Sequence, residues 1–141
     1  MLLKILFCTA MATLASGRHE GQSIQHLPMA MLLRAQKITL PCIEETKANH
    51  DIFGKLLAGT IEKDETSQKW FWCFTQRGRF VDEEGHFNTT SMARLVGEHP
   101  RIPEFKEYLL ECNKITKETP IETLYAMDEC LNDNSPIVFS L

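Results

Sequence analysis

The chain has 141 residues, with 15 basic and 19 acidic side chains and a formal net charge of -4 at pH 7. An acidic chain without a basic cluster is a poor partner for nucleic acid or for an anionic membrane surface, because both need Lys and Arg gathered on one face. We therefore expect no nucleic-acid partner. The length suits one domain with a real hydrophobic core.

The first 17 residues have the layout of a secretory signal peptide. Lys4 precedes the apolar run at 5–14, and small residues follow at Ala15 and Gly17. A helix needs roughly 20 apolar residues to cross a bilayer, and no segment of the sequence reaches that length, so we expect no stable membrane insertion. Cleavage after Gly17, or alternatively after Ala15, would leave a secreted, extracellular domain over residues 18–141.

Removal of the signal peptide would also remove Cys8 and leave four cysteines. An even number in a secreted chain predicts that all of them are paired. Four cysteines permit three connectivities. The four are Cys42, Cys73, Cys112 and Cys130.

The spacing of apolar residues and the positions of Gly and Pro predict an all-α fold. Residues 18–27 are polar, and we expect them to be mobile. Pro41 is expected to kink or divide the first helix, and no alternating run is long enough to predict a sheet. The expected helices cover residues 28–48, 51–58, 67–77, 89–96, 103–115 and 120–131.

The clearest local signal is the segment 119–122, where Thr, Pro, Ile and Glu form a capping box with proline at the first helical position. The expected inner face of the helix that follows includes Leu124, either Met127 or Asp128, and Leu131. In one straight helix, Cys112 and Cys130 would lie about 27 Å apart, whereas a disulfide needs Cα atoms within about 7 Å. A helix hairpin broken at this segment would bring the two together and leave Cys42 for Cys73.

The cysteine separations of 31, 39 and 18 residues resemble those of the insect odorant-binding proteins (the pheromone and general odorant-binding family), in the four-cysteine "Minus-C" subgroup. Members with six cysteines carry two more, at positions that correspond to Lys69 and Ile121. The segment 78–88 also resembles the family's loop between its third and fourth helices. The resemblance covers residues 28–136.

This resemblance implies about six short helices around an internal apolar cavity, with disulfides Cys42–Cys73 and Cys112–Cys130. It implies a carrier that reversibly binds small hydrophobic, odorant-like or pheromone-like molecules, without a cofactor or a metal and without enzymatic activity. A chemosensory receptor is a possible protein partner. The same fold also suits a carrier of a non-odour ligand in haemolymph, saliva or reproductive fluid.

The predicted ligand-binding residues are the aromatic, Leu, Met and Val side chains on the inner faces of the helices and in the tail. Trp70 and Phe74 share one helix face, and Tyr108 is the expected polar contact for the ligand. The tail 137–141 is too apolar to float freely and either covers the cavity mouth or packs in an outer groove. Each of these residues has ordinary core packing as its alternative. The full set is Trp70, Phe74, Met92, Leu95, Tyr108, Leu109, Leu124, Met127, Val138 and Phe139.

Other motifs carry less information. The five histidines could form a pH switch, but their spread along loops and helix ends favours solvated surface positions. Asn88 begins a glycosylation sequon and is equally suited to cap a helix. The sequence contains no nucleophile elbow and no pair of histidines at metal-binding spacing. A helical cytokine-like signalling protein is a further alternative, although such bundles use longer helices.

Overall fold

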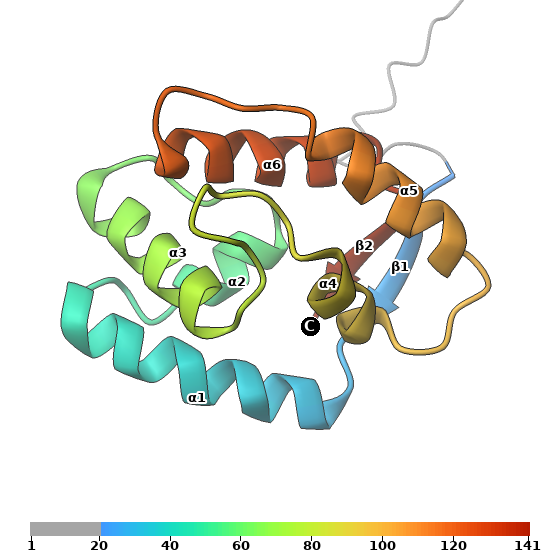
Figure 1. Cartoon of the computed structure of the whole chain (residues 1–141). Coiled ribbons are helices and arrows are strands. Elements are labelled where there is room, and N and C mark those ends of the chain that lie inside the picture. Colours follow the sequence, from blue (N-terminus) through green and yellow to red (C-terminus); the bar gives the residue numbers. More distant parts are fainter. Residues whose placement is uncertain (1–20) are drawn as a thin grey trace, which may run out of the picture.

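The computed structural model describes residues 21–141, so the predicted signal peptide lies outside the described part of the chain. Six helices and two short strands follow one another within it (Figure 1). They are β1 (Ser23–His26), α1 (Met29–Thr46), α2 (Ile52–Leu57), α3 (Glu65–Arg77), α4 (Thr89–Val96), α5 (Ile102–Cys112), α6 (Pro120–Asn134) and β2 (Ile137–Ser140). The predicted all-α class with six short helices is confirmed.

Capping side chains begin three of the helices. Asn88 accepts a hydrogen bond from the backbone N–H of Ser91 at 3.1 Å, and Thr119 accepts one from Glu122 at 3.2 Å. Asp64 does the same for α3, which therefore begins two residues before the predicted start. These bonds satisfy backbone donors that the first helical turn leaves without a partner.

Of the two expected effects of Pro41, a kink or a division of the first helix, division does not occur, because α1 is continuous from Met29 to Thr46. A proline inside a helix removes one backbone hydrogen bond. The residues around it are nevertheless anchored, since Thr39, Cys42 and Ile43 are all buried. Tertiary packing therefore holds the helix across the missing bond.

The expectation of no strand and of a mobile segment at 18–27 was also wrong for the residues described. β1 pairs with β2 in parallel, in a register that matches Ser23 with Ile137 and His26 with Ser140. The backbone N–H of Leu27 extends this ladder to the carbonyl of Ser140 at 3.0 Å. Parallel strands need a long crossover connection, and here all six helices form it.

Both predicted disulfides are present. Cys42–Cys73 joins α1 to α3 with a Cα–Cα distance of 5.8 Å, and Cys112–Cys130 joins α5 to α6 with a distance of 5.9 Å. By loop-closure arguments each bridge adds about 3 kcal/mol. One bridge therefore fixes α1 to α3 and the other fixes α5 to α6.

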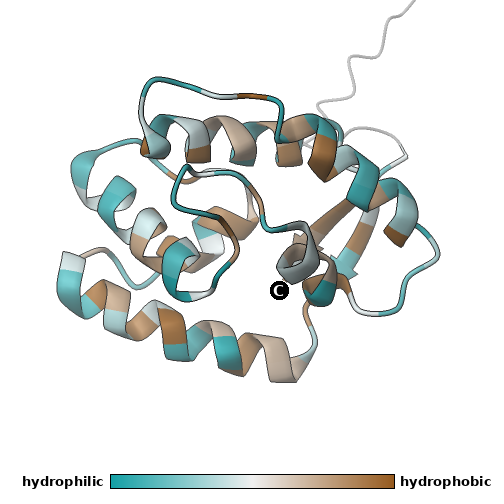
Figure 2. Ribbon diagram, in the orientation of Figure 1, coloured by the Kyte–Doolittle hydropathy of each residue, from teal (hydrophilic) through white to brown (hydrophobic). Residues whose placement is uncertain are grey.

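The arrangement leaves an interior between α1 and α6, which run along opposite sides of the molecule (Figure 1). The helices α2, α3 and α4 and the 79–88 loop lie between them, and Figure 2 shows hydrophobic residues along the strands and on part of each helix. The longest described helix, α1, has 18 residues, shorter than the helices that the signalling alternative requires. No helix among residues 21–141 is long and apolar enough to span a bilayer.

The 79–88 loop is pinned against the start of α6. Gly85 has φ +91°, and a Cβ atom there would lie 2.3 Å from the carbonyl oxygen of Pro120. Asp82 stabilises the same turn by accepting hydrogen bonds from the backbone N–H groups of Glu84 and His86. Glycine is therefore required at position 85 both for its backbone conformation and for the close approach.

Candidate ligand pocket

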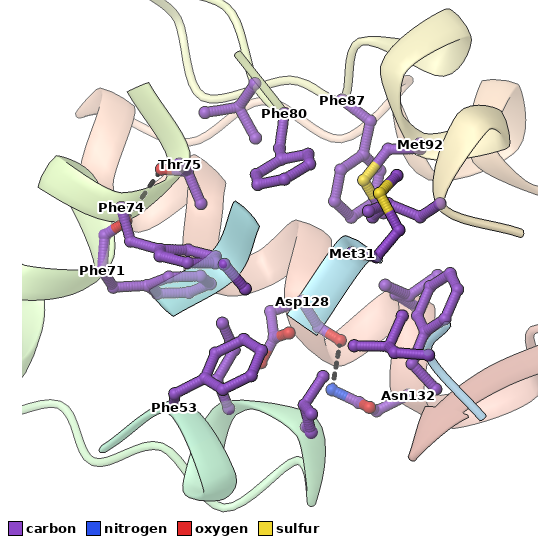
Figure 3. Close-up of a pocket in the computed structure, with 18 of the residues that line it drawn as sticks. Met31, Phe53, Phe71, Phe74, Thr75, Phe80, Phe87, Met92, Asp128 and Asn132 are labelled. Atoms are coloured by element: carbon purple, nitrogen blue, oxygen red, sulfur yellow. Dashed lines mark hydrogen bonds between the residues drawn. The ribbon is translucent and has the colours of Figure 1, made fainter. Parts of the chain in front are cut away.

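An apolar cavity of about 110 Å³ lies between α1, α2, α3, α4, α6 and β2. Helix α5 contributes no residue to its wall. Figure 3 shows side chains from these separate elements turned toward one another across the cavity. The wall consists of Leu27, Met31, Arg34, Ala35, Phe53, Leu56, Leu57, Phe71, Phe74, Thr75, Phe80, Val81, Phe87, Met92, Leu95, Leu124, Asp128, Leu131, Asn132, Val138 and Phe139.

Aromatic rings form one continuous part of this wall. The ring centroids of Phe53 and Phe80 both lie 5.6 Å from that of Phe74. Trp70 stacks behind Phe74 at 4.9 Å, so the two residues share a helix face as predicted. These distances suit aromatic contacts, and the mutual packing of large flat rings holds α2, α3 and the 79–88 loop at fixed spacings.

Flexible aliphatic side chains complete the wall. Met31 of α1 and Met92 of α4 lie on the side of the cavity away from Phe53 (Figure 3). An unbranched thioether chain has several rotatable bonds and adapts its shape at low cost. The pocket therefore combines a rigid aromatic side with a deformable one.

Four polar residues interrupt the apolar lining: Arg34, Thr75, Asp128 and Asn132. Arg34 is exposed and lies at the edge of the cavity. The Thr75 hydroxyl donates to the carbonyl of Phe71 at 2.8 Å. The Asn132 amide donates to the backbone carbonyl of Asp128 at 2.9 Å (Figure 3).

Asp128 is the carboxylic acid of the pocket. Burial raises its pKa to about 7, because the apolar surroundings disfavour the charged form, and the Asn132 side chain opposes part of that rise. Asp128 also borders a second, more polar groove with Lys117 and Asp133, and the residue as a whole is half-buried. At neutral pH this group therefore exchanges readily between its neutral and charged forms.

Six of the ten predicted ligand-binding residues lie in the wall of this one pocket and four do not. All four outside it are in or near the filled core, and Trp70, Leu109 and Met127 are fully buried there. The six in the wall are Phe74, Met92, Leu95, Leu124, Val138 and Phe139.

The structure places Tyr108 away from the pocket, where it caps the end of α6. Its hydroxyl donates to the carbonyl of Cys130 at 2.6 Å and accepts from the backbone N–H of Asn134 at 3.2 Å. The only donor of this hydroxyl is used within the protein, and Tyr108 does not line the cavity. Tyr108 therefore holds α5 to α6.

Sequence reasoning missed much of the aromatic wall, including Phe53, Phe71, Phe80 and Phe87. It also missed Asn132, and it included Asp128 only as an alternative inner-face position of the sixth helix. The signal for Asp128 was its position four residues after Leu124 on one helix face. Phe80 and Phe87 lie in the loop, where no periodicity indicates an inward direction.

The histidines lie elsewhere, and His19 falls outside the described residues. None of the four that are described lines the pocket. His86 is half-buried, and its Nε2 lies 2.9 Å from the carbonyl oxygen of Ile115. Within residues 21–141 no group of three His, Cys, Asp or Glu side chains is placed to hold a metal ion.

Comparison with known proteins agrees with this arrangement. Six chains of solved structures match the fold, among them odorant binding protein 7 from Anopheles gambiae with four disulfide bridges, in complex with an azo compound. That match has a TM-score of 0.59 and 20% sequence identity, and it covers 74% of this chain and 85% of the other. A search of curated sequences found no match.

The sequence profile of the PBP/GOBP family matches residues 25–134. This range spans most of the chain and includes all six helices and both disulfides. It also includes every residue of the pocket wall except Val138 and Phe139. Members of the family are carriers that bind small hydrophobic molecules, and they are not enzymes. The chain therefore belongs to the PBP/GOBP family of insect odorant-binding proteins.

Proposed function

We propose that this protein is a secreted carrier that takes up one small, mostly apolar molecule in the pocket between α1 and α6. The supporting observation is the pocket itself, an apolar cavity whose wall contains residues of five helices and of β2. Loading would be an equilibrium, driven by removal of apolar ligand surface from water at about 25 cal/mol per Å². A dissociation constant on the order of micromolar is ordinary for such a site.

The cavity volume limits the ligand. A cavity of about 110 Å³ is below the roughly 300 Å³ at which typical ligand pockets begin. An apolar cavity of roughly 150 Å³ is known to accept benzene. The proposed ligands are accordingly single-ring or short-chain molecules, and larger ones require Met31 or Met92 to change rotamer.

Two further features support secretion. The predicted signal peptide at 1–17 lies outside the described residues, and its role is part of this proposal. Both pairs of cysteines are bridged, and disulfides persist in oxidising compartments such as the extracellular space. Edman sequencing of the protein secreted from insect cells would test the cleavage site, and retention of Met1 would contradict it.

Binding is tested by titrating the oxidised protein with an apolar fluorescent probe and displacing the probe with small volatile compounds. We expect saturable binding at one site that is lost when the disulfides are reduced. No saturable binding by a correctly bridged, helical protein would contradict the proposed function.

A matched pair of variants locates the site. Met92→Phe adds a ring to the pocket wall, whereas Met29→Phe makes the same change at a side chain that is 69% exposed and does not line the cavity. We expect Met92→Phe to weaken probe binding at least fivefold and Met29→Phe to leave it unchanged. Equal effects of the two variants would place the ligand outside this pocket.

A further inference from the structure

The pocket wall offers a ligand more hydrogen-bond acceptors than donors. Thr75 and Asn132 already use donor groups on backbone carbonyls of the protein. The Asn132 amide has a second N–H, which donates to the Asp128 carboxyl. The remaining donor in the wall is therefore Arg34, whose side chain is exposed at the edge of the cavity. The acceptors include Thr75 Oγ1 and Asn132 Oδ1, and the strongest of them is the Asp128 carboxyl, which has about four lone-pair sites when ionised.

The Asp128 carboxyl is placed to meet a ligand. Figure 3 shows Asp128 on α6 between Phe53 and Phe74 on one side and Met31 on the other. Its partner among the described residues is the Asn132 amide, and no basic side chain of residues 21–141 forms an ion pair with it. Much of its accepting capacity is therefore left for a molecule in the cavity.

On these observations we propose that the pocket selects a small apolar amine, whose ammonium group donates hydrogen bonds to the Asp128 carboxylate while its hydrocarbon part contacts Phe53, Phe74 and Met31. This inference rests on the proposed carrier function and specifies its ligand class. An acceptor-only ligand such as an ester or ketone finds no free donor in the interior of this wall.

An ammonium group suits this site better than a neutral donor. A buried carboxylate is costly without a counter-charge, and a ligand cation supplies that charge. Charge-assisted hydrogen bonds are also roughly twice as strong as neutral ones. An alcohol with the same carbon skeleton donates a hydrogen bond to the carboxylate but does not compensate its negative charge. The expected affinity of the alcohol therefore lies between those of the amine and the hydrocarbon.

The charges around Asp128 are few. Arg34 of α1 lines the same cavity, and Lys117, Glu129 and Asp133 border the outer groove that Asp128 shares. α2, α3, α4 and β2 present no charged side chain to the cavity. Amine affinity is accordingly expected to rise as the pH increases from 5 to 8 and Asp128 ionises.

The test is isothermal titration calorimetry of the oxidised protein with three molecules that share one skeleton: 2-phenylethylamine, 2-phenylethanol and ethylbenzene. We expect the amine to bind at least tenfold more tightly than ethylbenzene at pH 8, with the alcohol between them. In Asp128→Asn, whose side chain has nearly the same shape, we expect this preference to fall to less than threefold while ethylbenzene affinity stays the same or improves.

Asp133→Asn is the matched control, because it removes a carboxylate from the same helix at an exposed position outside the pocket wall. We expect it to keep the full amine preference. Circular dichroism and the melting temperature confirm that each variant is folded.

The outcomes separate this inference from the proposed function. If ethylbenzene and the apolar probe bind but the amine has no advantage, or if Asp128→Asn keeps that advantage, the amine proposal is overturned and the carrier function stands. If Asp133→Asn loses the amine preference as fully as Asp128→Asn does, the preference comes from general surface charge, and the proposal is also overturned. If neither the probe nor any of the three molecules binds, the carrier function itself fails.

Discussion

Two buried regions of this protein are built from the same kinds of residue but differ in how they are filled. On the α5 side, Phe105, Leu109 and Cys112 are fully buried, and none of them lines the apolar cavity. On the other side, Phe53, Phe74 and Phe80 surround a cavity of about 110 Å³. Apolar character alone therefore does not distinguish a filled core from a cavity wall. The difference lies in whether neighbouring elements approach closely or are held apart by packed aromatic rings.

The two regions also treat polar groups differently. In the filled region the Tyr108 hydroxyl is fully committed to Cys130 and Asn134. In the pocket the Asp128 carboxyl keeps free accepting capacity and a raised pKa. A committed polar group stabilises the fold, whereas an uncommitted one costs stability and is available to a ligand.

The largest expected effect is the loss of a side chain from the filled region. Leu109→Ala should lower the free energy of unfolding by about 3–5 kcal/mol, because it removes a buried side chain and leaves a void. Leu95→Ala, in the half-buried pocket wall, should cost about 2 kcal/mol or less, since its side chain already borders a cavity. Urea denaturation measures both, and equal costs would contradict the distinction between the two regions.

The next effect concerns Asp128 and pH. Burial raises the pKa of Asp128 from its ordinary 3.8 to about 7 in the folded protein, so the folded state holds this proton more tightly than the unfolded state. Its contribution to stability is then fully present below pH 4 and is lost as the pH rises to 7 and above. Asp128→Asn should therefore stabilise the protein at pH 8 by about 2 kcal/mol, a value reduced for partial solvent access.

Thermal melts at pH 4 and pH 8 measure this effect. The gain from Asp128→Asn should be much smaller at pH 4, where the native carboxyl is already protonated. Asp133→Asn provides the exposed control. A gain that does not change with pH would show that the native carboxyl is not held in its neutral form.

A smaller effect is expected at Tyr108. Tyr108→Phe removes the hydroxyl that links α5 to the end of α6, and it should cost about 1–2 kcal/mol in stability. Probe affinity should change less than twofold, because the residue does not line the pocket. If Tyr108→Phe keeps near-native stability but loses probe binding, Tyr108 contacts the ligand after all.

The smallest expected effect is that of a substitution at Met92, on the flexible side of the pocket wall. Met92→Leu conserves side-chain volume and should change stability by less than about 1 kcal/mol. It should leave single-ring ligands unaffected and weaken larger ones severalfold, because branched Leu adapts less readily than Met. Competition titrations with ligands of increasing length measure the trend, and Met29→Leu is the exposed control. A uniform effect on all ligands would contradict a role in adaptability.

The sequence by itself determined most of the helices. The capping box at 119–122 and the cap at Asn88 are local, so the bounds of α4 and the start of α6 were predicted correctly. The cysteine spacing resembled the family that the profile match confirms, and both disulfide pairs were predicted. These features depend on contacts within a few residues or on covalent geometry, which the sequence states directly.

Only the tertiary structure decided the strand pair and the pocket wall. β1 and β2 are too short to be recognised singly, and each is stabilised by hydrogen bonds to the opposite end of the chain. Trp70 and Phe71 are adjacent and both buried, yet only Phe71 lines the cavity. Helical periodicity identifies the face that leaves water, because burial follows from hydropathy. Whether that face meets another side chain or an open cavity depends on the spacing of distant elements, which no local pattern encodes.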